Sequence, residues 1–293
     1  MVNNGFDIPI VFFIYKRPDL TFRVFEVIRK IKPENLIIVA DGPIDATEKR
    51  LTDLTRIIVS DIDWTCNVKR LYSDVNLGCA RRIQTGLNEA FSIYEKLIVI
   101  EDDCLPSISF FRYCSELLDK YNDNYDIMHI SGSNILGQQN LSEDYFFTNI
   151  AFPPWGWASW RRAWEKFNFS IDINDWETRK LNYKKSKQIN FTKYPNFERI
   201  IKKVLETKQT WDIHWMLTIL DNKGLVIYPT KNLISNIGFD ERGVHTKKNS
   251  AFQNMQNATL HFPLKLTKKS IVSKNNIKKI VLNIESFAKE LIK

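Results

Sequence analysis

Short apolar runs alternate with amphipathic segments along the first half of the chain. Brief runs rich in Ile, Leu and Val are typical of strands buried on both faces of a sheet, whereas apolar residues spaced three or four apart are typical of helices. We therefore predict strands over residues 8–15, 35–40, 66–72, 97–101 and 125–131, and helices over residues 20–31, 46–61, 81–94 and 107–121. The alternation predicts an α/β fold in which helices cover both faces of a mostly parallel central sheet.

The pattern loosens after Gly132. Residues 142–164 are dense in aromatic residues and proline and end in a segment with helical spacing, and residues 180–208 are basic and polar. Later elements are predicted as helices over residues 195–207 and 210–221, a strand over 225–229, a loop over 232–246 and a basic amphipathic helix over 276–293. We expect one domain over residues 1–262, with halves at 1–103 and 104–262, followed by a basic tail helix within residues 263–293.

Composition narrows the class of protein. The chain has 293 residues, of which 44% are hydrophobic, so it can bury one large core or two joined ones. Aromatic residues make up 13%, with eight Trp, which suits a cleft where aromatic side chains stack on sugar rings. Lys and Arg exceed Asp and Glu by 42 − 34 = 8, and this charge favours an anionic partner: a nucleotide, a nucleic acid or an acidic membrane.

Neither the cysteines nor the hydropathy indicates export. The four cysteines form no C-x-x-C pair and no disulfide-like framework, which fits a reducing compartment. The N-terminal apolar run is interrupted by Lys16 and Arg17, so it predicts neither a signal peptide nor a span. No other run approaches the roughly 20 apolar residues that a membrane span needs. We expect a cytoplasmic protein.

Three consecutive acids end the fourth predicted strand: Glu101, Asp102 and Asp103, which we call the acidic cluster. Open α/β sheets bind ligands at the carboxyl ends of their strands. Three adjacent carboxylates repel one another and lose hydration, so we expect a cation to be bound there. The alternative is a solvated strand end without a ligand.

Two other predicted strand ends should lie at the same edge of the sheet, because parallel strands share their carboxyl edge. Arg17 follows the first strand, and Asp41 follows the second. A carboxylate there can accept the imide N–H of a uracil, and an Arg beside it can hold ribose or phosphate. The alternatives are a plain turn at Asp41 and a surface cation at Arg17.

The segment NLGCARR, residues 76–82, leads into a predicted helix. Gly78 allows a backbone to approach a ligand closely, the start of the helix offers free N–H groups to an anion, and Arg81 adds charge. Neither a Walker loop nor a G-x-G-x-x-G motif is present, which disfavours NTP hydrolysis and dinucleotide binding. The alternative is an ordinary turn.

These motifs together resemble those of a known family. YKRP, ADG, NLGCARR and IEDDC occur in the order found in GT-A fold glycosyltransferases, most closely the N-acetylglucosaminyltransferase I family and bacterial family 2-like glycosyltransferases. A W-G-W element at residues 155–157 and a W-D element at residues 211–212 continue the resemblance, which covers residues 8–246. It implies a GT-A (Rossmann-like) sheet with a nucleotide-binding half and an acceptor or catalytic half.

The resemblance also implies an activity: an inverting, metal-dependent glycosyltransferase that takes a sugar from a nucleotide sugar, with UDP favoured. Its acceptor would be a hydroxyl on a glycan or lipid-linked molecule in surface polysaccharide or glycoconjugate synthesis. The roles implied are Asp103 and His245 as ligands of Mn²⁺ or Mg²⁺, Glu101 and Asp102 with Arg17, Asp41, Gly78 and Arg81 at the donor nucleotide, Asp212 as catalytic base, and Trp155, Trp157 and Trp211 as a sugar or acceptor platform.

Two other functions are weighed against this one. A sugar-phosphate nucleotidyltransferase has a similar sheet, but it would normally carry a Gly-rich loop after the first strand, which IYKRPDL lacks. A non-catalytic nucleic-acid-binding protein would place its basic residues among stacked aromatics, whereas here they gather in residues 180–208 and the tail. We therefore expect no nucleic acid partner.

The tail helix bears on location. A basic amphipathic helix can lie on the anionic inner face of a membrane, where each Lys near the surface contributes about 1 kcal/mol. A peripheral location at the inner membrane face is therefore expected for the cytoplasmic enzyme. The alternative is a helix that packs on its own domain or on a second subunit, in an oligomer.

Overall fold

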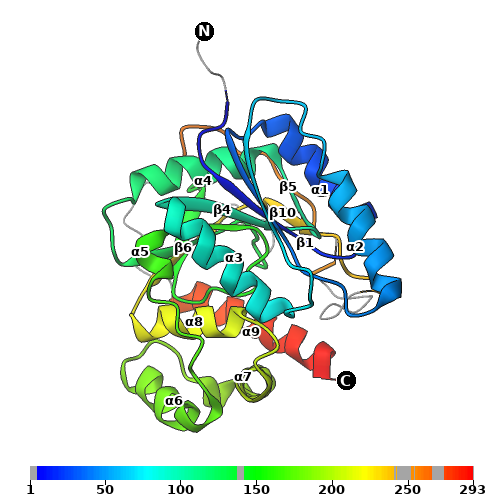
Figure 1. Cartoon of the computed structure of the whole chain (residues 1–293). Helices are drawn as coiled ribbons and strands as arrows, with labels where there is room; N and C mark the ends of the chain where they lie inside the picture. The colour runs from blue at the N-terminus through cyan, green and yellow to red at the C-terminus, as the bar shows by residue number, and fades with distance from the viewer. Residues whose placement is uncertain are drawn as a thin grey trace.

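The computed structural model describes residues 5–136, 142–240, 242, 252–253, 255–265 and 274–292. An eight-stranded sheet forms its centre, in the order β3-β2-β1-β4-β8-β6-β9-β7 (Figure 1). The strands are β1 (Ile10–Ile14), β2 (Asn35–Ala40), β3 (Asn67–Tyr72), β4 (Lys96–Glu101), β6 (Ile127–Ser131), β7 (Tyr145–Thr148), β8 (Trp157–Trp160) and β9 (Leu225–Pro229). A smaller sheet pairs β5 (Cys104–Pro106) with β10 (Ile234–Asn236).

The first four strands of the sheet are parallel, as the alternating pattern predicts. β1 lies between β2 and β4, and all five of its residues are buried. β8 then runs antiparallel to both β4 and β6, and β7 runs antiparallel to β9. The predicted α/β fold with a large, mostly parallel central sheet is therefore confirmed, with antiparallel strands confined to the second half of the chain.

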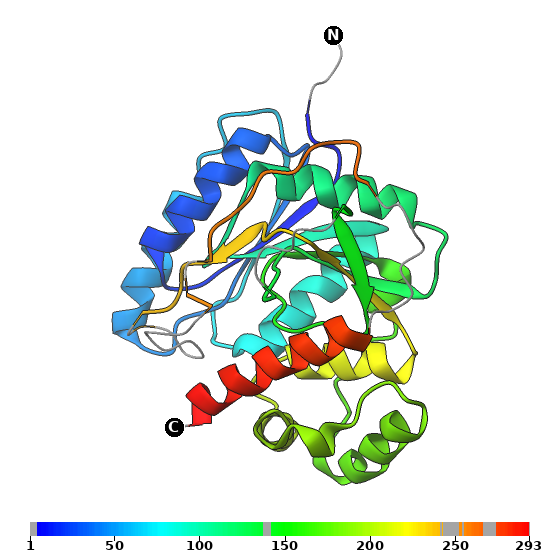
Figure 2. The ribbon, with the colours of Figure 1, turned by 180° about the vertical axis from the view of Figure 1, so that it is seen from behind.

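Helices cover both faces of this sheet. α3 (Cys79–Ile93) packs on one face, while α1 (Pro18–Ile31), α2 (Ala46–Ile58) and α4 (Ile108–Lys120) lie together on the other (Figures 1 and 2). The local sequence explains where they begin: α1 has Pro18 at its first position, and the Asp45 carboxylate accepts the Glu48 N–H at 2.8 Å to cap α2.

The predicted helical segment near residue 160 is confirmed only in its centre, because a strand runs into it. Only Arg161–Trp164 is helical (α5), whereas Trp157–Trp160 form β8 in the middle of the sheet. The predicted loop over 232–246 likewise contains β10. Strands of three or four residues are too short to show a period of two, so the sequence pattern could not identify them.

The remaining helices form a layer beyond one edge of the sheet, where Figure 2 shows the tail helix α9 (Lys274–Ile292) beside α7 (Pro195–Thr207). They are α6 (Trp176–Lys185), α7 (Pro195–Thr207), α8 (Asp212–Asp221) and α9 (Lys274–Ile292). Two short 3₁₀ turns lie among them, η1 (Ile173–Asp175) and η2 (Phe191–Lys193).

The tail helix α9 packs on its own domain, the alternative that the sequence left open. Its Ile280, Val281 and Ile284 are buried, so this part of its apolar face cannot enter a membrane. The Glu285 carboxylate accepts the backbone N–H groups of Asn196 at 3.0 Å and Phe197 at 2.7 Å, and so caps the start of α7. The expected membrane contact through this face is therefore corrected. Among the described residues, no helix combines the length and the apolar character that a membrane span requires.

Candidate functional site

The predicted site residues of the first half of the chain lie at one edge of the sheet. β1 pairs in parallel with β2, Ile14 opposite Ala40, and with β4, Phe13 opposite Glu101. Arg17, Asp41 and the acidic cluster therefore extend from neighbouring strand ends, as expected. This carboxyl edge is where open α/β sheets bind ligands.

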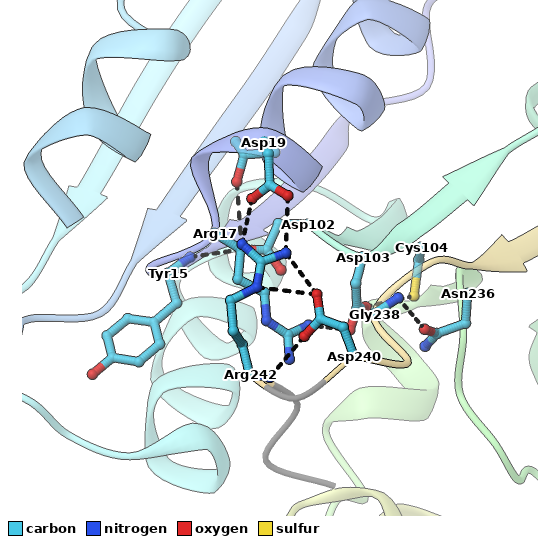
Figure 3. A network of polar contacts seen from close by, with 11 residues as sticks. Tyr15, Arg17, Asp19, Asp102, Asp103, Cys104, Asn236, Gly238, Asp240 and Arg242 are labelled. Carbon is cyan, nitrogen blue, oxygen red and sulfur yellow. Dashed lines mark hydrogen bonds and ion pairs between the residues drawn. The ribbon is translucent and has the colours of Figure 1, made fainter. Parts of the chain in front are cut away.

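Asp103 is paired with Arg17. The Arg17 Nη1 donates to Asp103 Oδ2 at 3.0 Å, and the two side chains are 11% and 18% exposed (Figure 3). The Cys104 thiol contacts the other carboxylate oxygen at 3.4 Å. One cation thus already faces the acidic cluster, and the small remaining exposure leaves the Asp103 carboxylate accessible from one side.

Asp102 is a buried carboxylate with partners inside the protein. Its Oδ2 accepts the backbone N–H of Tyr15 at 3.0 Å and lies 3.4 Å from the Thr21 hydroxyl. Burial, followed by the neighbouring Asp103 carboxylate, raises the pKa of Asp102 to about 7. These contacts tie the end of β4 to the end of β1 and to α1, and a contact of Asp102 with the donor stays a prediction.

Glu101 stands in a strongly negative environment. Burial raises the pKa of Glu101 well above its usual value, and the carboxylates of Asp103, Asp102 and Asp212 raise it further, in that order. Asp212, the first residue of α8, is therefore close enough to add to the field at the acidic cluster. The fold thus brings the predicted Asp212 to the predicted rim. Its Oδ1 accepts the backbone N–H of Ile213 at 2.9 Å.

Asp41 holds a backbone loop. Its carboxylate accepts three N–H groups, from Gly42 and Leu77 on Oδ1 and from Gly78 on Oδ2, each at 2.9 Å. Both oxygens accept backbone N–H groups and the residue is buried, so recognition of a uracil imide by Asp41 stays a prediction. Its carboxylate fixes the segment that leads into α3.

The start of α3 is open. Gly78 precedes the helix with φ +78°, and a Cβ placed there would meet no atom within 4 Å. Within the described part of the chain, the N–H groups of Cys79, Ala80 and Arg81 have no protein acceptor, and the Arg81 side chain is exposed without an ion pair. Free N–H groups at a helix start favour an anion, so this position suits a phosphate.

The tryptophans are part of the core, which corrects the expected platform. Trp157 and Trp211 are 1% and 2% exposed and stack on each other with centroids 5.4 Å apart. Trp155 is 8% exposed and packs edge-on against Phe239. A sugar ring needs an exposed ring face to stack on, and none of these three side chains offers one.

The expected metal ligands are only partly described. His245 lies outside the described residues. Among those that are described, no group of three or more His, Cys, Asp or Glu side chains is arranged to hold a metal ion. Carboxylate oxygens such as those of Asp103 are the donors that Mg²⁺ and Mn²⁺ prefer. The residues present therefore fit a cation that takes some of its oxygen ligands from the protein and the rest from a bound phosphate.

Sequence reasoning missed a polar network beside this rim. The Tyr15 hydroxyl donates to Glu48 Oε2 at 2.5 Å, and the Asn76 side-chain amide donates to that hydroxyl and to the Gly42 carbonyl, both at 2.8 Å. Tyr15 and Asn76 lie within motifs that were identified, YKRP and NLG, but nothing in either motif indicates that they meet. The network joins the ends of β1 and β2 to the loop before α3.

No protein-family model and no curated protein matches the chain. Among solved structures, a UDP-glucose pyrophosphorylase complexed with UDP-glucose aligns with a TM-score of 0.40 and 12% identity, over 78% of this chain and 93% of its own. A UTP-bound UGPase from Acinetobacter baumannii gives 0.39 and 11%, over 78% and 88%. A 4-diphosphocytidyl-2C-methyl-D-erythritol synthase from Anaerococcus prevotii gives 0.33 and 10%, over 55% and 76%.

These comparisons correct the expectation of a glycosyltransferase. None of the three structures is named as one; they are nucleotidyltransferases, the class that the sequence left as its alternative. No sequence match supports the N-acetylglucosaminyltransferase I family either. Because identity is 12% or less, the function has to be argued from the site itself.

Proposed function

We propose that the chain is a metal-dependent transferase that handles a nucleotide sugar, and specifically a sugar-phosphate nucleotidyltransferase. The observation that supports this is the meeting of three features at one sheet edge. They are the acidic cluster, the Arg17 guanidinium beside it, and the open start of α3 at Gly78. Carboxylates for a cation and donors for phosphates are what a nucleoside triphosphate requires.

The reaction would be an in-line displacement at phosphorus. A phosphate oxygen of the sugar phosphate attacks the α-phosphorus of the nucleoside triphosphate and forms the new P–O bond. The bond from the α-phosphorus to the bridging oxygen breaks, and pyrophosphate leaves with the electron pair. A bound Mg²⁺ or Mn²⁺ would supply charge neutralisation on the phosphate oxygens.

The start of α3 would take the place of the Gly-rich loop that this chain lacks after β1. The N–H groups of Cys79, Ala80 and Arg81 supply donors without a side chain in the way, because the space beside Gly78 is open. Asp41 holds that segment in place through the Leu77 and Gly78 N–H groups. Arg17 and Arg81 add positive charge for the phosphates.

The carboxylates would divide two tasks. Asp103, with Glu101 beside it, would hold the cation, since its carboxylate is partly exposed and Oδ1 has only the weak thiol donor of Cys104 among the described residues. Nucleotidyl transfer needs no general base, because a sugar phosphate is already ionised at neutral pH. Asp212 would therefore have a different role: its carboxylate would accept a hydrogen bond from a hydroxyl of the sugar rather than activate a nucleophile.

The test is pyrophosphate exchange. Purified protein is incubated with Mg²⁺ or Mn²⁺, each of the four common nucleoside triphosphates and a panel of sugar 1-phosphates that includes glucose 1-phosphate. Pyrophosphate release is followed in the forward direction, and nucleoside triphosphate formation from UDP-glucose and pyrophosphate in reverse. We expect turnover that EDTA abolishes and that Asp103→Asn reduces by at least about a hundredfold.

Asp123→Asn is the matched control, because Asp123 is an exposed acid on the turn after α4 and should leave turnover unchanged. If no member of the panel exchanges pyrophosphate, and the protein instead releases a nucleoside diphosphate from a nucleotide sugar, nucleotidyl transfer is refuted. In that case the acidic cluster would still be tested as the cation site by the same Asp103→Asn variant.

A further inference from the structure

A segment from the far end of the chain lies over the Arg17–Asp103 pair. It consists of residues 237–240 and Arg242, which we call the strap (Figure 3). It follows β10, whose Asn236 pairs with Cys104 of β5. The Ile237 N–H then donates to the Asp103 carbonyl at 2.8 Å. The backbone of the strap is therefore fixed directly to the backbone of Asp103.

Gly238 fills the space beside the pair. A Cβ at this position would lie 2.3 Å from Asp103 Oδ2 and 2.7 Å from Arg17 Nη1. Both distances are far below van der Waals contact. The backbone of Gly238 does not have a positive φ, so the constraint is space rather than conformation. A side chain here would have to displace the Asp103 carboxylate, the Arg17 guanidinium or the strap.

Asp103 has little freedom to move away. It carries a short side chain, and the hypothetical Cβ would also lie 2.8 Å from the Asp103 Cβ, which cannot shift without its backbone. That backbone is held by the Ile237 N–H. The contact between Gly238 and the pair is thus fixed by backbone hydrogen bonding rather than by the flexible ends of side chains.

The other end of the strap is latched to α1. The Arg242 guanidinium donates to both oxygens of Asp19, at 2.8 and 2.9 Å, and also contacts Asp240 (Figure 3). Its hydrogen bonds lower the pKa of Asp19 and of Asp240. Asp19 lies two residues after Arg17, so the latch ties the strap to the helix that begins directly after Arg17. Phe239, 2% exposed, anchors the middle against Trp155.

We propose that the strap is a positioning element for the cation and phosphate site, and that Gly238 is its positioning residue. This inference rests on the proposed function, because it assigns the strap to the Arg17–Asp103 pair of that site. The strap restricts the pair to one geometry, because Gly238 lies directly against both side chains. Gly238 acts through Arg17 and Asp103, and the latch at Arg242 keeps it in place.

The test compares Gly238→Ala with wild type and with Gly5→Ala. Gly5 is the matched control, because the three atoms nearest to a Cβ there would all belong to the flexible Glu34 side chain, far from the site. Binding of Mn²⁺ together with UTP is titrated by the loss of the electron paramagnetic resonance signal of free Mn²⁺. The temperature is one at which circular dichroism shows every variant folded. We expect binding at least about tenfold weaker and turnover on the order of a hundredfold lower in Gly238→Ala, and no change in Gly5→Ala.

Arg242→Gln provides a second variant should Gly238→Ala fail to fold, since the Arg242 side chain is 48% exposed and its loss should be tolerated. Releasing the latch should weaken Mn²⁺ and UTP binding by roughly threefold to tenfold while the melting temperature changes little. A merely structural strap would change the melting temperature and leave that binding intact.

The outcomes separate the two proposals. If wild type binds Mn²⁺ with UTP and the folded strap variants bind it equally well, the strap has no positioning role and the proposed function stands. If wild type binds neither ligand and exchanges no pyrophosphate, the proposed function fails, and the inference about the strap fails with it.

Discussion

The Asp41 carboxylate accepts the backbone N–H of Gly78 at 2.9 Å, which joins the end of β2 to the start of α3. The same carboxylate accepts two further N–H groups, from Gly42 and Leu77. A buried carboxylate with three backbone donors is a structural tie. It also determines where the free N–H groups of α3 point.

Asp41→Ala should therefore affect both stability and phosphate binding. Loss of three charge-assisted hydrogen bonds should lower the free energy of unfolding by about 2–4 kcal/mol, measured by urea denaturation. UTP affinity should fall as well, because the start of α3 is released. Asp53→Ala, which removes only an exposed ion pair with Lys49, should cost less than about 1 kcal/mol. A changed base preference at unchanged stability would contradict this role and favour base recognition by Asp41.

Binding of Mn²⁺ should weaken as the pH falls through about 7. The pKa of Asp102 is raised to about 7 by burial and by Asp103, and burial followed by the neighbouring carboxylates also raises the pKa of Glu101 well above its usual value. Protons therefore compete with the cation at the acidic cluster. Titrations between pH 5.5 and 8.5 should show affinity rising with pH, by at most about tenfold per unit for each proton released. An affinity that is flat over this range would exclude the acidic cluster as the cation site.

The Asp102 carboxyl group should make the metal-free protein less stable as the pH rises. Because the folded pKa of Asp102 lies above its usual value of 3.8, the folded state binds this proton more tightly than the unfolded state. Its contribution to stability is present at low pH and is lost as the pH rises from about 4 to about 7. Asp102→Asn keeps an acceptor for the Tyr15 N–H and should stabilise the metal-free protein at pH 8 by about 1–2 kcal/mol. A lower melting temperature for Asp102→Asn at pH 8 would contradict this assignment.

Glu285 should stabilise the start of α7 as a capping residue. Glu285→Ala leaves the Asn196 and Phe197 N–H groups without their carboxylate acceptor, and should lower the free energy of unfolding by about 1–2 kcal/mol. Glu206→Ala, an exposed position near the end of the same helix, is the control and should change it by less than about 0.5 kcal/mol. UTP binding should be the same in both variants. Equal stability of the two would show that the tail helix is held by its apolar contacts alone.

Trp157 should behave as a core residue. Trp157→Ala removes a side chain that is 1% exposed and stacked on Trp211 and His129, so the free energy of unfolding should fall by about 3–5 kcal/mol. Trp157→Phe should recover part of that loss and leave sugar-phosphate affinity unchanged. Denaturation and binding titrations check both. Loss of sugar-phosphate affinity in a fully stable Trp157→Phe would restore the platform hypothesis.

The first half of the site could be predicted because it depends on local patterns. Each apolar run identifies a strand, each amphipathic segment identifies a crossover helix, and parallel strands then end at one edge. Arg17, Asp41 and Glu101 lie at the same edge for that reason. The hydrogen-bond partners of these acids could not be predicted. Asp41 and Asp102 accept backbone N–H groups, which no side-chain pattern encodes.

The sequence by itself determined the α/β class, the succession of the first strands along the chain and the edge at which the acids gather, since periods of two and 3.6 and the direction of parallel strands are local properties. Only the tertiary structure decided that Gly238 touches Asp103, that Arg242 is latched to Asp19, that Glu285 caps α7 and that the tryptophans are buried. These contacts join segments far apart in the chain, and the type of a side chain alone does not determine which distant segment packs against it.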